Sequence, residues 1–351
     1  MKRLLSILLC FVSLTVFASE PAKEGAQEGG FNPGEMILEH IGDSHEWHFA
    51  TLGEGEQANH LSIPLPIIAY QPGAGLNVFS SSNLAHGHSH NGLKLEEDKL
   101  VAENGSKVYD FSITKNTASL LISAVLMLLV FTAVARGYRR NQGKAPRGIQ
   151  SFFEPIIIFI RDEIAKKNIG PRYERYMPYL LTAFFFIWFN NMMGLMPGAA
   201  NLSGNIAVTM VLAVMTLIIT LASSNKYYWA HIFATPGVPK LVLLVMIPVE
   251  LLGIITKPFS LMIRLFANIT AGHIVVLSFI SLVFIFKSWA VAPVTLAFGL
   301  FINVLELLVA VLQAFIFTLL TAMYIGGAVE EHHDADMQIG GGNGADQAHA
   351  H

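Results

Sequence analysis

Residues 261–273, LMIRLFANITAGH, place an arginine and a histidine inside a mostly apolar segment that has no other ionisable residue. The surrounding residues 240–286 contain few other charged side chains. Over the whole chain of 351 residues, 53% are hydrophobic, only 13% are charged, and the mean hydropathy is +0.52. Soluble domains are about 25% charged, so this composition indicates a membrane protein. The two ionisable residues in this stretch therefore need a functional explanation.

Apolar segments of sufficient length predict an all-α polytopic membrane protein with about five transmembrane helices. A span of about 20 residues crosses about 30 Å of hydrocarbon. We expect a membrane domain over residues 116–329, with spans near 116–135, 177–197, 204–223, 240–286 and 288–327. The last two segments are longer than an upright span needs, so they are expected to be strongly tilted or bent.

The distribution of basic residues predicts the orientation. Residues 136–175 contain 10 Lys and Arg against 4 Asp and Glu, which favours the cytoplasmic side. An exported N-terminal segment over residues 19–115 then lies in the periplasm, and the polar tail, residues 330–351, in the cytoplasm. Apolar residues at helical spacing in 148–165 predict a helix lying along the membrane surface.

The first 18 residues have the pattern of a secretory signal peptide. Lys2 and Arg3 precede an apolar run, and VFA at residues 16–18 resembles a cleavage site. A short first membrane anchor is the alternative. Cys10, the only cysteine, lies inside this segment, so a processed chain would contain no disulfide and no thiolate metal site.

The two polar segments carry histidines that raise the question of a metal. In residues 19–115, short apolar pieces are expected to form strands or extended chain. His86, His88 and His90 occupy every second position there, so in an extended chain they would point the same way. A solvated loop is favoured there, because no carboxylate or cysteine completes a metal site. Residues 330–336, EEHHDAD, lack the His-Glu-x-x-His spacing of metallohydrolases. We therefore predict no metal site and no cofactor.

The intramembrane polar residues follow the geometry of a helix. Asn268 lies one turn from Arg264 on the same face, whereas His273 lies on the opposite face, roughly 13 Å along the axis. In the last span, Asn303, Glu306 and Gln313 form one polar stripe. Ionisable groups at this depth typically line an ion pathway or a proton relay.

With these intramembrane residues, the sequence resembles subunit a of the F-type ATP synthase. The matching motifs are KPFSLMIRLFANITAG at residues 257–272, QAFIF at 313–317 and NNMMGLMP at 190–197. The resemblance implies that Arg264 is the essential stator arginine, that Gln313 and Asn268 lie beside it, and that Glu250 is the acid of one aqueous half-channel.

One departure from many bacterial members concerns a pair of titratable residues. His273 stands where those members have glutamate, and Glu306 stands where they have histidine, an exchange also seen in mitochondrial members. The exchange preserves one acid and one imidazole, which is expected if the two residues share a site.

The resemblance implies a non-catalytic stator subunit of the F0 proton channel, in the cell inner membrane. The implied partners are the subunit c ring, the subunit b stalk, the rest of the F1F0 complex and membrane lipid, with no nucleic acid. A secondary ion transporter using intramembrane Arg, His and Glu is the alternative, although the chain shows no internal repeat. Whether H⁺ or Na⁺ is the coupling ion is left open.

Overall fold

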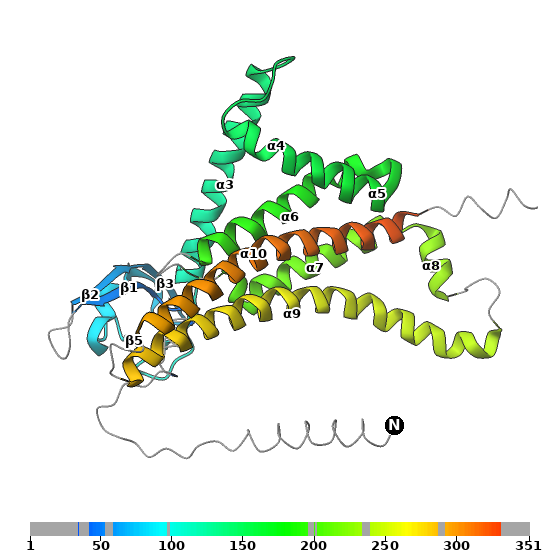
Figure 1. The fold of residues 1–351 in the computed structure, drawn as a ribbon. Helices are drawn as coiled ribbons and strands as arrows, with labels where there is room; N and C mark the ends of the chain where they lie inside the picture. Colours follow the sequence, from blue (N-terminus) through cyan, green and yellow to red (C-terminus); the bar gives the residue numbers. More distant parts are fainter. Residues whose placement is uncertain are drawn as a thin grey trace, which may run out of the picture.

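The computed structural model describes residues 34, 42–52, 59–96, 99–195, 200, 202–233, 239–286 and 292–330. The predicted signal peptide, the polar tail beyond Glu330 and the last two residues of the predicted span near 177–197 lie outside these residues. The described part consists of a small strand domain followed by a helical domain (Figure 1).

Within the described residues, seven strands precede the first long helix and form three small antiparallel sheets. The sheets pair β1 with β2, order β4-β3-β7, and pair β5 with β6. Their bounds are β1 Glu46–Leu52, β2 Asn59–Pro64, β3 Pro66–Gln71, β4 Gly75–Ser80, β5 Leu93–Glu96, β6 Lys99–Ala102 and β7 Tyr109–Asp110, with a 3-10 turn η2 at Ser81–Gly87. The expectation of strands in this segment is confirmed, so the all-α description applies to the helical domain only.

Strand alternation produces the core of the strand domain. Ile67 and Ala69 of β3 point to one face and are fully buried. They pack with the buried Leu84, Leu93 and Leu100 from the following segments. This cluster holds the three-stranded sheet against η2 and the β5–β6 hairpin. The strand domain therefore has an apolar core of its own.

The strand domain is bonded directly to the first turn of α3, Lys115–Arg140. The carboxylate of Asp43 accepts a hydrogen bond of 3.1 Å from the backbone N–H of Asn116 and another of 3.1 Å from the Thr114 hydroxyl. A carboxylate at a helix N-terminus satisfies backbone donors that the helix leaves free. The domain thus serves as the N-terminal cap of α3.

A second contact at the same junction joins His45 to Asp110. His45 Nε2 lies 2.7 Å from Asp110 Oδ2, and the histidine is 5% exposed. Burial raises the pKa of Asp110, but hydrogen bonds from Ser112 and from His45 outweigh it, so the pKa lies below its usual value. This contact ties the segment before β1 to β7, the strand that leads into α3.

Four helices of the described part are long and apolar enough to cross a membrane. They are α3, α7 Ile206–Ser223, α9 Lys240–Phe286 and α10 Ala292–Val329. The remaining predicted span, near 177–197, is the helix α6 Tyr173–Gly194, which is not among these four. The chain is thus a mostly helical, multi-pass membrane protein, and the number of five spans remains a prediction.

The long helices differ sharply in direction. In Figure 1, α6, α7, α9 and α10 run roughly side by side, whereas α3 stands steeply across them. α9 contains Pro248 and Pro258 and is bowed along its length. A strong tilt of α9 and α10 relative to an upright α3 agrees with their excess length, and their angle to the bilayer remains a prediction.

Shorter helices connect the long ones. They are α4 Ile149–Phe159, the π-helical turn η3 Ile160–Ala165, α5 Lys166–Ile169, the 3-10 turns η4 Gly170–Arg172 and η5 Leu202–Gly204, and α8 Lys226–Phe233. The predicted helix over 148–165 is therefore present as α4 and η3. Its apolar residues Phe153 and Ile160 are buried in the main core.

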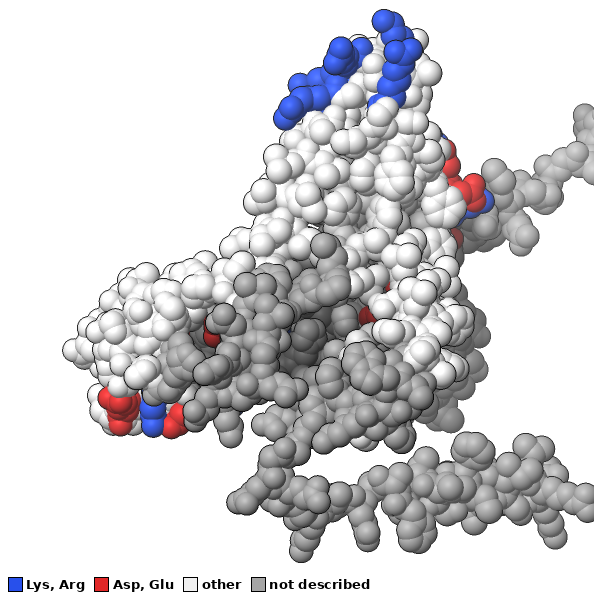
Figure 2. All heavy atoms as spheres, turned by 60° about the vertical axis from the view of Figure 1, so that its left-hand side comes forward, with Lys and Arg blue, Asp and Glu red and all other residues white. Residues whose placement is uncertain are grey.

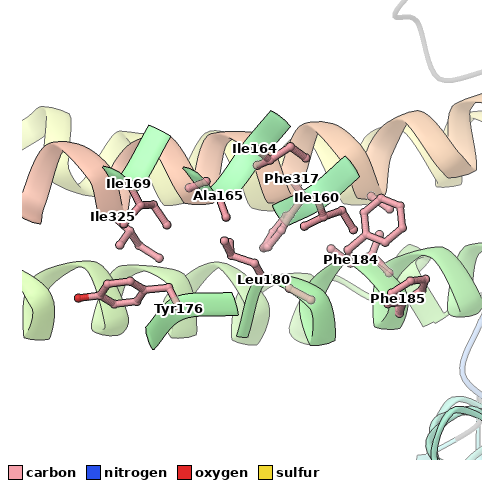
Figure 3. Close-up of a cluster of buried hydrophobic side chains, with 14 of the residues drawn as sticks. Ile160, Ile164, Ala165, Ile169, Tyr176, Leu180, Phe184, Phe185, Phe317 and Ile325 are labelled. Carbon is pink, nitrogen blue, oxygen red and sulfur yellow. The ribbon is translucent and has the colours of Figure 1, made fainter. Parts of the chain in front are cut away.

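In the main core, α6, α10 and the η3–α5 segment pack against one another. Figure 3 shows Ile164 and Ile169 meeting Leu180 of α6 and Phe317 and Ile325 of α10. The approach is closest where α10 meets α5. A Cβ at Gly326 would lie 1.8 Å from the backbone oxygen of Asn168, so only glycine fits at this position. This packing fixes the position of the polar residues that α10 carries.

Candidate functional site

Arg264 and Gln313 lie together between α9 and α10. They line one small crevice whose other walls are apolar, formed by Leu261, Leu265, Ile316 and Phe317. Gln313 is buried, with 3% of its surface exposed, and Arg264 is half-buried. Among the described residues, no carboxylate forms an ion pair with Arg264. The guanidinium therefore has a fixed positive charge and an apolar surrounding without a counter-charge from this part of the chain.

His273 and Glu306 form a second polar site between the same two helices. His273 Nε2 lies 3.7 Å from Glu306 Oε1, and the two side chains are 17% and 4% exposed. Gly272 makes room for the acid, since a Cβ there would lie 2.9 Å from Glu306 Oε1. An acid and an imidazole are thus packed side by side with little space around them.

Glu250 belongs to a third site, an open pocket of about 300 Å³ between α7, α8, α9 and the end of α10. Its titratable lining residues are Tyr227, Tyr228, His231, Glu250, Lys257, Tyr324 and Glu330. Burial, and then the negative charge of Glu250, raise the pKa of the Tyr228 hydroxyl. A polar pocket of this size has room for several water molecules.

The three sites follow one another along α9. Glu250 precedes Arg264 by 14 positions, about 21 Å of helix, and His273 follows Arg264 by nine positions, about 13 Å. The arginine therefore stands between a tightly packed acid–imidazole pair and an open polar pocket. This order is the main geometric result for the site.

Some expectations about faces need correction. Arg264 and His273 were expected on opposite faces of one helix, yet both adjoin side chains of α10. α9 is bowed in Figure 1, so the spacing of an ideal straight helix does not determine which of its side chains face α10. Of the three residues in the predicted polar stripe on α10, Glu306 and Gln313 are buried, whereas Asn303 is exposed.

Asn268 lies one turn after Arg264 and is exposed on the surface of α9. It lines neither the Arg264 crevice nor the Glu250 pocket. Any role of Asn268 therefore depends on a partner at this surface.

Two buried polar residues hold the site together and were not identified as site residues from the sequence. The Asn191 side-chain amide donates to the backbone oxygen of Ala310, at 3.3 Å, and the Ser203 hydroxyl donates to the Asn191 carbonyl oxygen, at 2.5 Å. Ala310 lies on α10 between Glu306 and Gln313. The sequence feature that could have identified Asn191 is the pair of asparagines at 190–191 within an otherwise apolar helix.

The described residues contain no group of three or more His, Cys, Asp or Glu able to hold a metal ion. His88 and His90 belong to the described part, whereas the side chain of His86 and residues 331–336 lie outside it.

Fold and site together define a class: a multi-pass helical membrane protein with a fixed cation held between two titratable polar sites. Comparison with known proteins gives the family. The ATP synthase A chain family matches residues 118–326, more than half of the chain, so this chain belongs to that family. A domain of unknown function (DUF8433) matches residues 36–120, which include the strand domain.

Curated relatives agree with this assignment. The ATP synthase subunit a of Chloroherpeton thalassium is 47% identical over 234 residues, covering 64% of this chain and 70% of the relative. The ATP synthase subunit a of Chlorobium phaeobacteroides, strain DSM 266, is 38% identical over 327 residues, covering 91% and 82%. The second match extends over the strand domain as well as the helical domain.

Proposed function

We propose that this chain is the stator subunit of the F0 sector of an F-type ATP synthase, providing two half-channels and the arginine that couples proton movement to rotation. The observation that carries the proposal is the position of Arg264. It is a half-buried cation without a described carboxylate partner, between two separate polar sites.

The energetic cost of such an arginine explains why a partner is needed. Insertion scales give about 3 kcal/mol for an arginine at the centre of a membrane helix. A counter-charge from outside the chain would offset this cost. The carboxylates of a subunit c ring moving past the exposed surfaces of α9 and α10 would supply it. Subunit b and the rest of the F1F0 complex are the further partners that family membership suggests.

Proton transport by such a carboxylate requires that it be protonated at one position of the ring and ionised at another. In contact with lipid it must be neutral, because a bare anion there is too costly. Opposite Arg264 the ionised form is favoured, so the carboxylate releases its proton there. The guanidinium itself does not give up a proton, so it blocks direct passage between the two half-channels.

In this proposal His273 and Glu306 exchange protons with the outer side, and the Glu250 pocket exchanges them with the cytoplasm. The pocket includes Glu330, the residue that leads into the tail predicted to be cytoplasmic. Figure 2 shows Lys and Arg gathered where α3 ends; the exposed basic residues there are Arg136, Arg139, Arg140, Lys144 and Arg147. We therefore place this end in the cytoplasm and the strand domain in the periplasm of an inner membrane.

Fusion reporters test this orientation. A reporter after Lys144 should report a cytoplasmic location, and one fused within residues 30–100 a periplasmic location. The opposite result at both sites would reverse the two half-channels.

Substitution of Arg264 tests the function. We expect Arg264→Ala to lower ATP synthesis by more than about 100-fold, the scale of losing one preorganised charge-stabilising group. Arg264→Lys should be severely impaired too, because burial can remove the charge of a lysine. The measurement is ATP synthesis in inverted vesicles, with co-purification of partner subunits as the check on assembly.

Arg175→Ala is the matched control, since Arg175 is exposed at the start of α6. It should leave ATP synthesis close to that of the unaltered protein. Near-normal synthesis in an assembled Arg264→Ala complex would reject the proposal.

A further inference from the structure

The three-stranded sheet of the strand domain has an apolar outer face. Its register pairs Tyr70 with both Leu76 and Tyr109, and Ile68 with Val78. The backbone N–H of Phe111 donates to the oxygen of Ile68 at 2.8 Å, which extends the second row beyond β7. Two adjacent rows of three apolar side chains result, Leu76–Tyr70–Tyr109 and Val78–Ile68–Phe111. We call these six residues the outer sheet face.

The outer sheet face is strongly exposed in the described structure. Leu76, Val78 and Phe111 are 65%, 61% and 64% exposed, and Tyr70 and Tyr109 are 45% and 43% exposed. The opposite face of the same sheet forms the buried core around Ile67 and Ala69. An antiparallel sheet with one solvated face normally has polar residues there, so a contiguous apolar face indicates a contact with something other than water.

The attachment of the domain determines what this face can reach. Phe111 precedes the first residue of α3 by only four positions, at most about 14 Å of extended chain. The bonds of Asp43 and His45 at the junction hold the sheet in a fixed position on the outer end of α3. The apolar surface of α3 begins within two turns, with exposed Leu121, Ile122 and Val125.

The composition of the outer sheet face is that of a membrane–water interface. The Tyr70 and Tyr109 rings lie 6.4 Å apart, and Lys107 Nζ lies 5.0 Å from the centre of the Tyr109 ring. Tyrosines at the headgroup level, with a lysine beside them for lipid phosphates, are typical of interfacial anchors. In Figure 2, most of the charged side chains visible on the lower left part of the molecule lie at its lower edge, and one acidic group is visible higher up.

We propose that the outer sheet face rests on the bilayer surface and inserts its apolar side chains into the interfacial region of the leaflet that α3 enters. The strand domain is then a membrane-surface anchor that fixes the outer end of α3. This role depends on α3 crossing the membrane and is independent of the proton pathway, so failure of either proposal leaves the other intact.

Site-directed spin labelling of the full chain in lipid nanodiscs tests the anchor. Cys10 is the only cysteine, so Cys10→Ser gives a cysteine-free background. A label is attached at Val78→Cys and, as a repeat on the other row, at Leu76→Cys. The matched control is Glu103→Cys, an exposed charged position of the same domain. Accessibility of each label to oxygen and to a water-soluble nickel complex is measured by EPR.

We expect the ratio of oxygen to nickel accessibility to be several-fold higher at Val78 and Leu76 than at Glu103. Equal ratios at all three positions would show that the face lies in water, and the proposal would be wrong. Shielding of the Val78 and Leu76 labels from both reagents would show that a protein covers the face, which would also overturn it.

Discussion

The two polar sites that flank Arg264 contain similar chemical groups but are built in opposite ways. Glu306 is packed against Gly272 and lies 3.7 Å from His273, with almost no exposed surface. Glu250 lies in a pocket of about 300 Å³ that it shares with His231, Lys257 and Glu330. The packed site leaves little space around its two titratable groups, whereas the open site has room for water.

The difference indicates how each site tolerates change. Under the proposed function, proton exchange at the packed pair involves two side chains 3.7 Å apart, so an altered charge or a shift of the acid affects both. In the open pocket, water and other titratable groups can take over part of the role of one residue. The packed site should therefore be sensitive to substitution and the open site tolerant.

Among changes to the two flanking sites, replacing one member of the packed pair should have the largest effect. His273→Glu leaves two carboxylates in one small site, where like charges raise one pKa strongly, and Glu306→His leaves two imidazoles without an acid. We expect each single change to lower ATP-driven proton pumping by more than about tenfold, a cost of about 1.4 kcal/mol or more in the limiting step.

The double exchange, His273→Glu with Glu306→His, restores one acid and one imidazole and should recover part of the activity. Such non-additivity is the signature of residues in contact. Pumping is compared at matched assembly of the complex. If the double exchange pumped protons no faster than the worse single variant, the paired-site interpretation would be wrong.

A smaller effect is expected from Gly272→Ala. The added Cβ would lie 2.9 Å from Glu306 Oε1, so the carboxylate must move relative to His273. Because no charged group is lost, we expect a several-fold reduction in proton pumping with normal assembly.

Gly253→Ala is the control for this change on the same helix, since a Cβ there meets nothing within 4 Å. It should pump at the unaltered rate. If both alanine variants behaved alike, close packing at Glu306 would not matter for transport.

The smallest effect is expected in the open pocket. Glu250→Gln removes one acid but leaves His231, Glu330 and space for water. We expect proton pumping to fall by about two- to threefold, less than 1 kcal/mol in the limiting step. Glu306→Gln, measured in parallel, should be far more damaging. An equal loss in the two variants would show that openness gives no tolerance.

Hydropathy and charge in the sequence were sufficient to predict the multi-pass helical class. The approach of His273 to Glu306 was also anticipated, because the exchange of acid and imidazole suggested a shared site. The space at Gly272 was not predictable, since it depends on how α9 packs against α10. The Glu250 pocket was not predictable either, because its walls come from four successive helices, and the sequence alone does not determine how these helices pack.

Proton flux through a locked complex tests most directly whether Arg264 separates the two sites. The subunit c ring is immobilised by a cross-link, and passive proton entry into vesicles under an imposed pH gradient is measured for the unaltered protein, Arg264→Ala and Arg175→Ala. With the ring locked, the account predicts no flux above background in the unaltered protein and in Arg175→Ala, and a clear flux in Arg264→Ala. If locked Arg264→Ala complexes were as impermeable as the unaltered protein, Arg264 would not be the barrier between the half-channels.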